Sequence, residues 1–223
     1  MPRTSKLVLL LFIVISVLVI GALLSEFVSV GYLKFAAGTR PTLEKTADAE
    51  PILPPLRDTD PLRGSQDKNA VVIIQFADFI NPSTKLLEPE LQRALRESPV
   101  PVRLIWRDAP RVADGPLSTL ASLAGRCALE QGRFWAMHDA LLTTIVVDTA
   151  SVSALASTVI PNVEKFNTCV KRGAYLDEVQ SDGALAEKQR IINTPVLFIG
   201  NKILTGTPSS SEIISAIQRA TLK

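Results

Sequence analysis

The residues with the most reactive side chains in this sequence are two cysteines, Cys127 and Cys169, and one histidine, His138. An even number of cysteines permits one disulfide in an oxidising compartment. Neither cysteine lies in a Cys-x-x-Cys motif, and the cation adjacent to Cys127 is Arg126. No cysteine–histidine cluster has the ligand spacing of a zinc site, so we predict no metal site and no cofactor. Ser83 and His138 are residue types used in nucleophilic hydrolysis, but such catalysis requires them within hydrogen-bond reach.

A short polar segment lies where a predicted strand gives way to a predicted helix, with the sequence Asn81-Pro82-Ser83-Thr84. The strand is the apolar, β-branched run 71–76, which is typical of a strand buried on both faces. Asn81 suits the N-cap position and Pro82 the first helical position, which predicts a helix to about residue 97. Residues 100–106 form a second buried strand, so the three elements predict a parallel β-α-β unit.

The second half of the chain is predicted to be mainly helical. Residues 116–189 carry a helical pattern, residues 195–199 and 203–204 predict a hairpin of two strands, and residues 212–222 predict a C-terminal amphipathic helix. The order β-α-β, helical block, β-β-α is that of an α/β, thioredoxin-like fold with a helical insertion.

Several segments of the sequence carry the motifs of one known family. Phe76-Ala77-Asp78-Phe79-Ile80-Asn81-Pro82-Ser83-Thr84 is similar to the pattern Phe-x-Asp-Phe-x-Cys-Pro-x-Cys, the active-site segment of the DsbA-like thiol–disulfide oxidoreductases, which this sequence resembles. The most specific match is residues 127–139, CALEQGRFWAMHD, which resemble the family's Cys-Ala-x-Glu-Gln-Gly-x-Phe-Trp-x-x-His-Asp. Further matches are RLIWRDAP at 103–110, FNTC at 166–169, and Asn193-Thr194-Pro195 with Phe198-Ile199-Gly200. The resemblance covers about residues 69–223.

The sequence departs from this family at its reactive positions, because Asn81 and Thr84 stand where the family has cysteines. Thiol–disulfide exchange requires a thiolate that attacks a disulfide sulfur, and a helix N-terminus lowers the pKa of that thiol. Asn81 has no titratable nucleophile, and Thr84 could not resolve a mixed disulfide. The family's chemistry is therefore not expected at residues 81–84. Either Asn81 caps the helix, or the backbone N–H groups at the helix start bind a carboxylate or a peptide carbonyl.

Two further expectations follow from the resemblance. The family's proline at the position of Pro195 is cis and exposes the preceding backbone, here Thr194, to an extended substrate. Asn81, Thr194 and Pro195 are thus predicted to form a polypeptide-binding groove, unless Pro195 only shapes a turn of the core. The resemblance also places both cysteines in the helical insert, where a structural disulfide between Cys127 and Cys169 is the favoured interpretation. Two separate buried thiols, or a displaced redox pair, are the alternatives, and His138 is expected to have a packing role.

The N-terminal region has the pattern of a membrane anchor. Residues 7–24 form an uncharged apolar run that, as a helix, spans about 27 Å, close to the thickness of a bilayer core. We predict an uncleaved signal anchor in residues 1–37 rather than a cleaved signal peptide, followed by a proline-rich linker at 38–68. Arg3 and Lys6 precede the run, which predicts a cytoplasmic N-terminus and a domain at 69–223 in the periplasm or at the cell exterior. The helical insert of that domain is predicted at about 113–190.

The charge balance bears on the partners of the protein. The formal net charge is +2, and basic and acidic residues are equal in number once Arg3 and Lys6 are set aside. This balance argues against nucleic acid as a partner, which requires a basic surface. The favoured function is a membrane-anchored module that binds an extended polypeptide or a membrane-protein partner without thiol exchange at residues 81–84. The alternatives are an oxidoreductase that uses Cys127 and Cys169, and a structural subunit of an envelope complex.

Overall fold

The computed structural model describes residues 53–110 and 115–222. The chain divides into two compact units, residues 1–49 and 50–223, and the first of these is not described. The predicted anchor at residues 7–24 therefore lies outside the described residues, as does the first part of the predicted linker, residues 38–52. Within the described ranges, no helix is both long and apolar enough to cross a membrane.

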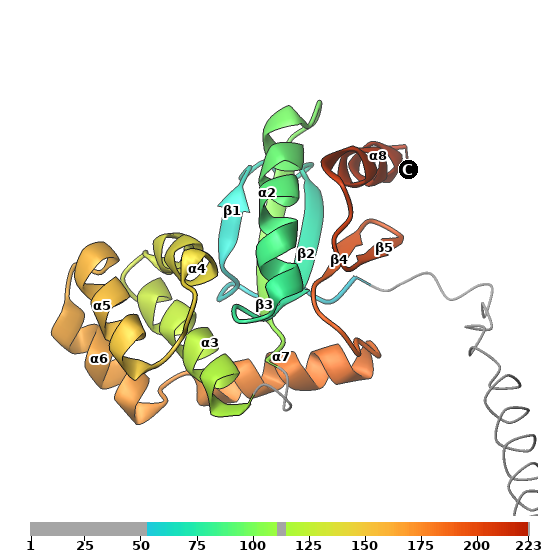
Figure 1. The fold of residues 1–223 in the computed structure, drawn as a ribbon. Coiled ribbons are helices and arrows are strands. Elements are labelled where there is room, and N and C mark those ends of the chain that lie inside the picture. The colour runs from blue at the N-terminus through green and yellow to red at the C-terminus, as the bar shows by residue number, and fades with distance from the viewer. Residues whose placement is uncertain (1–52, 111–114, 223) are drawn as a thin grey trace, which may run out of the picture. The chain divides into compact units, whose positions relative to one another are not determined.

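The described chain folds around a five-stranded sheet with strand order β1-β3-β2-β4-β5 (Figure 1). The central strands β2 (Val71–Ala77) and β3 (Val102–Asp108) are parallel, and β4 (Val196–Ile199) pairs antiparallel with β2. The edge strands β1 (Leu62–Gly64) and β5 (Lys202–Thr205) are both antiparallel to their neighbours. This is the thioredoxin-like α/β sheet that the order of elements predicts.

The helices follow the predicted order along the chain. α2 (Pro82–Glu97) connects β2 to β3 and completes the predicted β-α-β unit. The helical block contains α3 (Gly115–Leu129), α4 (Phe134–Thr143), α5 (Thr149–Val159), α6 (Val163–Arg172) and α7 (Leu176–Lys188). After the β4–β5 hairpin, α8 (Ser210–Ala220) starts at a capping box in which Ser209 and Glu212 bond each other's backbone N–H groups.

Helices cover both faces of the sheet. Apolar residues of α2 and α8, among them Leu91 and Ile217, pack with Ile73, Leu104 and Leu197 on one face. Ala186 of α7 packs with strand residues such as Phe76 and Phe198 on the opposite face. A third apolar cluster joins α3, α4, α5 and α6 into a helical lobe that lies beside the sheet in Figure 1. The loop at the start of α2 lies where this lobe meets the sheet.

The folded domain begins before the predicted boundary at residue 69. Residues 62–64, which the proline content assigns to the linker, form β1, where Leu62 pairs with Ile105 of β3. Gly64 has φ +99°, and an added Cβ would lie 2.5 Å from the Val102 carbonyl oxygen, so only glycine fits there. A three-residue edge strand is too short to produce a periodic pattern, which is why the composition of the segment predicts a linker instead.

Candidate functional site

Asn81 joins the start of α2 to the loop before β4. As the N-cap residue of α2, it accepts a hydrogen bond at Oδ1 from the Ser83 N–H at 2.8 Å. Its Nδ2 donates to the Thr194 carbonyl oxygen at 3.1 Å and to Thr194 Oγ1 at 2.9 Å. Asn81 is 7% exposed and Thr194 is 5% exposed, so these bonds lie in the interior. One carboxamide thus connects two segments that are 113 residues apart.

The backbone donors at the start of α2 are already engaged. Pro82 has no N–H, Asn81 Oδ1 binds the Ser83 N–H, and the Asn81 carbonyl oxygen accepts from the Thr84 N–H at 3.0 Å and from the Lys85 N–H at 3.3 Å. This is the helix cap that the sequence predicts for Asn81. A carboxylate could bind these N–H groups only if Asn81 released them.

The loop before β4 contains Thr194 and Pro195, and the peptide bond between them is cis. Asn81 occupies the Thr194 carbonyl, and the Pro195 carbonyl accepts from the Gly206 N–H at 3.0 Å. The structure thus brings together all three residues predicted for a groove. The Thr194 carbonyl oxygen, however, already carries a hydrogen bond from Asn81.

The remaining residues of the motif are placed by an aromatic cluster. Phe79 stacks on Trp106 with ring centroids 4.3 Å apart, and His138 lies edge-on to Trp106 at 4.8 Å. Thr84 and His138 are both fully buried, and His138 Nδ1 contacts Asp139 Oδ1 at 2.8 Å. Ser83 and His138 form no hydrogen bond with one another among the described residues, so the arrangement does not provide a hydrolytic pair.

Cys127 and Cys169 form a disulfide that joins α3 to α6 within the helical lobe. Cys127 is fully buried and Cys169 is 7% exposed. The Glu130 carboxylate lies 3.9 Å from Cys169 Sγ, and hydrogen bonds from Tyr175 and then from Lys165 lower the pKa of Glu130. A carboxylate at this distance disfavours a thiolate on Cys169, and burial hinders attack on the disulfide. The geometry is that of a structural disulfide.

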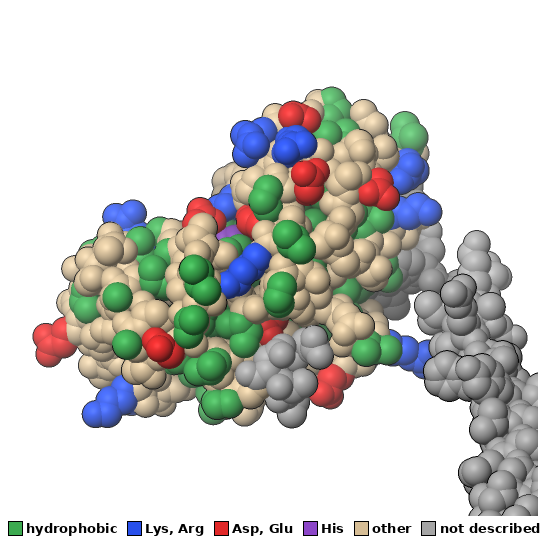
Figure 2. All heavy atoms as spheres, in the orientation of Figure 1, with side chains coloured by type: hydrophobic (Ala, Val, Ile, Leu, Met, Phe, Trp, Pro, Cys, Tyr) green, Lys and Arg blue, Asp and Glu red, His purple; other side chains and the backbone are tan. Residues whose placement is uncertain are grey.

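Exposed apolar side chains occur on the segments that carry the Asn81–Thr194 contact and on segments bonded to them. Leu86 projects from the first turns of α2, and Ile192 lies two residues before Thr194; they are 68% and 85% exposed. Ile145 and Val146 follow Thr144, whose carbonyl oxygen accepts a hydrogen bond from Lys85 Nζ at 2.5 Å. Leu117 precedes Ser118, which donates to Asp78 Oδ2 at 2.6 Å. Figure 2 shows hydrophobic side chains gathered in the lower half of this face, around the base of α2 and over α3 and α4. We call Leu86, Leu117, Ile145, Val146 and Ile192 the apolar rim.

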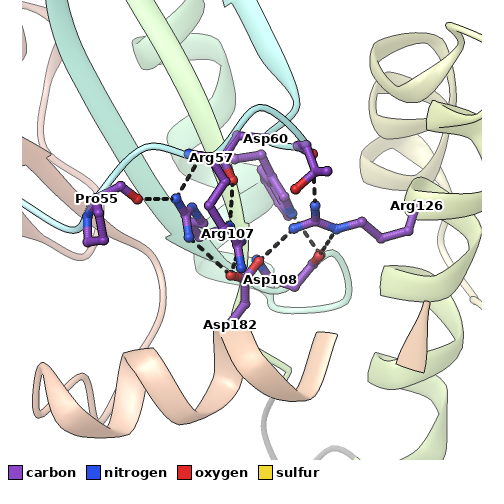
Figure 3. A network of polar contacts seen from close by, with 9 residues as sticks. Pro55, Arg57, Asp60, Arg107, Asp108, Arg126 and Asp182 are labelled. Atoms are coloured by element: carbon purple, nitrogen blue, oxygen red, sulfur yellow. Dashed lines mark hydrogen bonds and ion pairs between the residues drawn. The ribbon is translucent and has the colours of Figure 1, made fainter. Parts of the chain in front are cut away.

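A second polar feature is a buried network of three arginines and three aspartates (Figure 3). It connects the segment before β1 to β3, α3 and α7 through Arg57, Asp60, Arg107, Asp108, Arg126 and Asp182. Asp182 of α7 is its centre: Oδ2 accepts from Arg126 at 2.6 Å and from the Asp108 N–H at 3.2 Å, while Oδ1 contacts Arg107 at 3.3 Å and also Arg57. Burial and the neighbouring Asp108 raise the pKa of Asp182, despite the three arginines.

The network pairs its three arginines with three aspartates, and of its buried side-chain atoms in the described residues Arg107 Nε is left without a hydrogen-bond partner. Burial alone would lower the pKa of Arg126, but Asp108 and Asp182 raise it, so Arg126 stays cationic. Arg107 also donates to the Pro55 carbonyl oxygen at 2.7 Å and to Asp60 Oδ2 at 2.6 Å. We assign the network a structural role, which is to fix residues 55–60 to the domain. Arg107 and Asp108 lie in a matched segment of the sequence, which gave no sign of their partners 18–75 residues away.

Similar proteins identify the family. The fold and the helical lobe define a thioredoxin-like protein whose motif positions 81 and 84 contain no cysteine. The sequence model of one family, described as Thioredoxin, matches residues 57–219. The chain belongs to this thioredoxin family, and its fold is that of the DsbA-like members, as the sequence predicts.

Solved structures with the same fold include a thioredoxin-like oxidoreductase from Silicibacter pomeroyi DSS-3, with 24% identity and a TM-score of 0.67 over 75% of this chain and 95% of that one. BdbD from Bacillus subtilis has 21% identity and a TM-score of 0.66, over 74% and 94% of the two chains. The thiol-disulfide exchange protein alpha-DsbA2 from Wolbachia pipientis has 19% identity and a TM-score of 0.65, over 72% and 87%. These similarities establish the fold.

Two curated relatives are much longer proteins. The Na(+)/H(+) antiporter NhaA 3 of Salinispora tropica is 29% identical over 162 residues, which cover 71% of this chain and 24% of that protein. The antiporter NhaA 1 of Salinispora arenicola is 26% identical over 166 residues, covering 73% and 25%. The chain thus spans about a quarter of the length of the curated relatives it matches.

Proposed function

We propose that this protein is a thioredoxin-fold binding module that holds an extended polypeptide against the apolar rim without thiol–disulfide exchange at residues 81–84. The observation that carries the proposal is the rim itself. Large apolar side chains that gather on one face of a soluble domain mark a candidate site of protein interaction. Leu86, Ile145 and Ile192 are 68%, 95% and 85% exposed and come from three different parts of the chain.

The contacts of Asn81 determine what such a site can recognise. Because Asn81 donates to the Thr194 carbonyl, that carbonyl has one lone pair left for a second chain's N–H. Recognition then rests mainly on burial of apolar side chains, which depends little on the sequence of the ligand. Burying one large aliphatic side chain contributes about 1.5–3 kcal/mol.

The proposed location is the outer side of a membrane, with residues 7–24 as the anchor and the partner either a polypeptide or a membrane protein. The apolar run and the preceding Arg3 and Lys6 support this placement. The two relatives named as Na(+)/H(+) antiporters add support, because in them a homologous stretch is joined to an ion transporter.

A binding measurement with a thiol-free ligand tests the module. The full-length chain in lipid nanodiscs is titrated against a reduced, alkylated and fluorescently labelled unfolded polypeptide. Ile192→Asp is expected to weaken binding at least about tenfold, since about 1.4 kcal/mol corresponds to a factor of ten. Leu222→Asp is the control, because Leu222 is 84% exposed and lies away from the rim. It follows α8, and Ala220 of α8 packs on Gly200, at the opposite end of β4 from Pro195. Equal affinities of the two variants, or no binding by the unsubstituted chain, would refute the proposal.

Redox assays separate this function from the oxidoreductase alternative. The unsubstituted chain is expected to be inactive in insulin reduction and in oxidative refolding, whereas the double substitution Asn81→Cys with Thr84→Cys is expected to be active. Turnover by the unsubstituted chain that disappears in Cys127→Ser would establish the alternative instead. A chain that neither binds polypeptide nor turns over, but co-purifies with a membrane protein through residues 1–37, would be a structural subunit.

A further inference from the structure

His138 presents an unpartnered nitrogen inside the protein. Its Nδ1 lies 2.8 Å from Asp139 Oδ1, and because an ionised carboxylate only accepts, Nδ1 carries the proton and donates. In the neutral imidazole, the other nitrogen, Nε2, is then a bare acceptor. The His138 side chain is 0% exposed, and Nε2 has no hydrogen-bond partner among the described residues.

Glu88 faces this nitrogen from α2. Its Oε2 lies 4.0 Å from His138 Nε2 and has no hydrogen-bond partner in the described part of the chain, while its Oε1 accepts from Gln92 Nε2 at 2.6 Å. Two acceptors that face each other cannot satisfy one another, and leaving both buried costs free energy. Something that is positively charged or donates protons is needed between them.

We propose that His138 Nε2 and Glu88 Oε2 bind a divalent transition-metal ion of the zinc class, with Asp139 as the positioning carboxylate behind the imidazole. Zinc–ligand distances are about 2.0–2.2 Å for imidazole nitrogen and carboxylate oxygen, so two ligand atoms 4.0 Å apart must approach each other by about 0.6 Å to share one tetrahedral ion. A metal-binding histidine typically donates its other N–H to a carboxylate, as His138 does.

The surroundings allow the ion to enter and to complete its coordination with water. A cavity of about 320 Å³ borders the cluster and is lined in part by Glu88, Asp139 and Arg63. The ligand atoms of Glu88, His138 and Asp139 all lie within 4.8 Å of one another.

Nearby cations limit the affinity. Arg63 pairs with Asp139 at 2.7 Å and stacks over the Trp135 ring at 4.3 Å, so its charge is largely matched by Asp139. Its other guanidinium nitrogen is 4.0 Å from Glu88 Oε1, and Lys85 lines the same cavity. With two protein ligands and two cations nearby, the site is weaker than a three-histidine zinc site.

The single histidine makes the test direct. Full-length chain without an affinity tag, labelled with ¹⁵N-histidine and held in detergent micelles, is titrated with ZnCl₂ while the two imidazole nitrogens are followed by long-range ¹H–¹⁵N correlation. We expect an Nδ1–H tautomer without zinc and a saturable shift of the Nε2 resonance with zinc. Glu88→Gln should weaken binding at least about tenfold, and Asp139→Asn by about 10–100-fold. Glu97→Gln, an exposed carboxylate on the same helix, should bind as the unsubstituted chain does.

An Nε2 resonance that does not move on zinc addition would overturn the proposal and leave a buried water or a shared proton between the two acceptors. Zinc binding that is unchanged in Glu88→Gln would also overturn it, by placing the ion elsewhere. Since both readouts are independent of polypeptide binding, the result stands whether or not the apolar rim functions as proposed.

Discussion

At the scale of single residues, Asn81 has a different role from the thiol it replaces in the family pattern. A cysteine at a helix start has a lowered pKa because the helix terminus stabilises the thiolate. Asn81 uses the same position to accept from the Ser83 N–H and to donate to Thr194. The carboxamide is both acceptor and donor, so one side chain serves the helix and the loop before β4.

Asn81→Ala is expected to lower the free energy of unfolding by about 1–3 kcal/mol, because it removes a helix cap and leaves the buried Thr194 carbonyl without its donor. Urea unfolding of residues 50–223 followed by circular dichroism measures the change. Asn81→Ser restores the cap without the bond to Thr194. Its free energy of unfolding should therefore lie between those of Asn81→Ala and the unsubstituted domain. If Asn81→Ala were as stable as the unsubstituted domain, the contact would have no energetic weight.

The disulfide between Cys127 and Cys169 encloses a long loop, with a sequence separation of 42. On the chain-entropy estimate, its removal lowers stability by about 4 kcal/mol. The double substitution Cys127→Ala with Cys169→Ala tests this in the same unfolding experiment. In the native unsubstituted domain, both cysteines should resist alkylation even with a mild reductant; rapid labelling under those conditions would contradict a structural role.

At the scale of elements, the arginine–aspartate network determines how the segment before β1 is attached. Asp182 is fully buried on α7 and contacts arginines from three elements. A buried ion pair adds little net stability relative to apolar packing, but removing one partner leaves an uncompensated charge. The network connects residues 55–60, β3, α3 and α7. Its net contribution to stability is small, but the loss of one charged partner would lower stability strongly.

Asp182→Ala should destabilise residues 50–223 by about 3–5 kcal/mol, since it removes the oxygens that accept from Arg107 and Arg126 and leaves these donors without a partner in the interior. Thermal unfolding by calorimetry measures the loss. Asp177→Ala, at an exposed position on the same helix, is the matched control and should change stability only slightly. Equal destabilisation by both would mean that the charge on α7, and not the network, is responsible.

The helix caps predict how the stability of the fold decreases at acidic pH. Hydrogen bonds from the Ser151 backbone and side chain lower the pKa of Asp148, the N-cap residue of α5. A carboxyl with a lowered folded-state pKa stabilises the fold above its ordinary pKa, and this contribution is lost as pH falls through the lowered value. Asp148→Asn keeps a capping oxygen but does not titrate, so its urea midpoint should vary less between pH 6 and pH 3. An unchanged pH profile would exclude a role for this cap in acid unfolding.

Asp182 changes the pH dependence of folding stability in the opposite direction. Its pKa is raised, chiefly by burial, so the folded state favours its protonated form, and its contribution is lost as pH rises through that raised pKa. These two carboxyl groups therefore change the stability of the domain in opposite directions. The Asp148 cap stabilises the fold at neutral pH relative to acidic pH, and buried Asp182 does the reverse.

At the scale of the whole molecule, local patterns predicted most elements, and long-range partners were the part that the sequence could not supply. The apolar run 71–76 and the Asn81-Pro82 start predicted β2 and α2, because both depend on neighbours in the chain. An N-terminal strand within the linker was an open alternative, but β1 could not be located because three residues have no measurable period. The contact of Asn81 with Thr194, and that of His138 with Glu88, each join residues separated by tens of positions. Their residue types were visible, but their proximity depends on the fold.

The membrane topology is a prediction from residues 1–37, which lie outside the described part of the chain. An uncharged run of 18 residues preceded by Arg3 and Lys6 favours an N-terminus in the cytoplasm. Alkaline phosphatase is active only outside the cytoplasm. When it is fused after Lys223, we therefore expect phosphatase activity in bacterial cells, and we expect the fusion to sediment with membranes. Deleting residues 1–37 should abolish both properties.

Replacing Arg3 and Lys6 with glutamate should reduce phosphatase activity without releasing the fusion from the membrane, because orientation depends on the flanking charges whereas insertion depends on the apolar run. An inactive, soluble fusion would refute the anchor, and an inactive, membrane-bound one would reverse the predicted orientation.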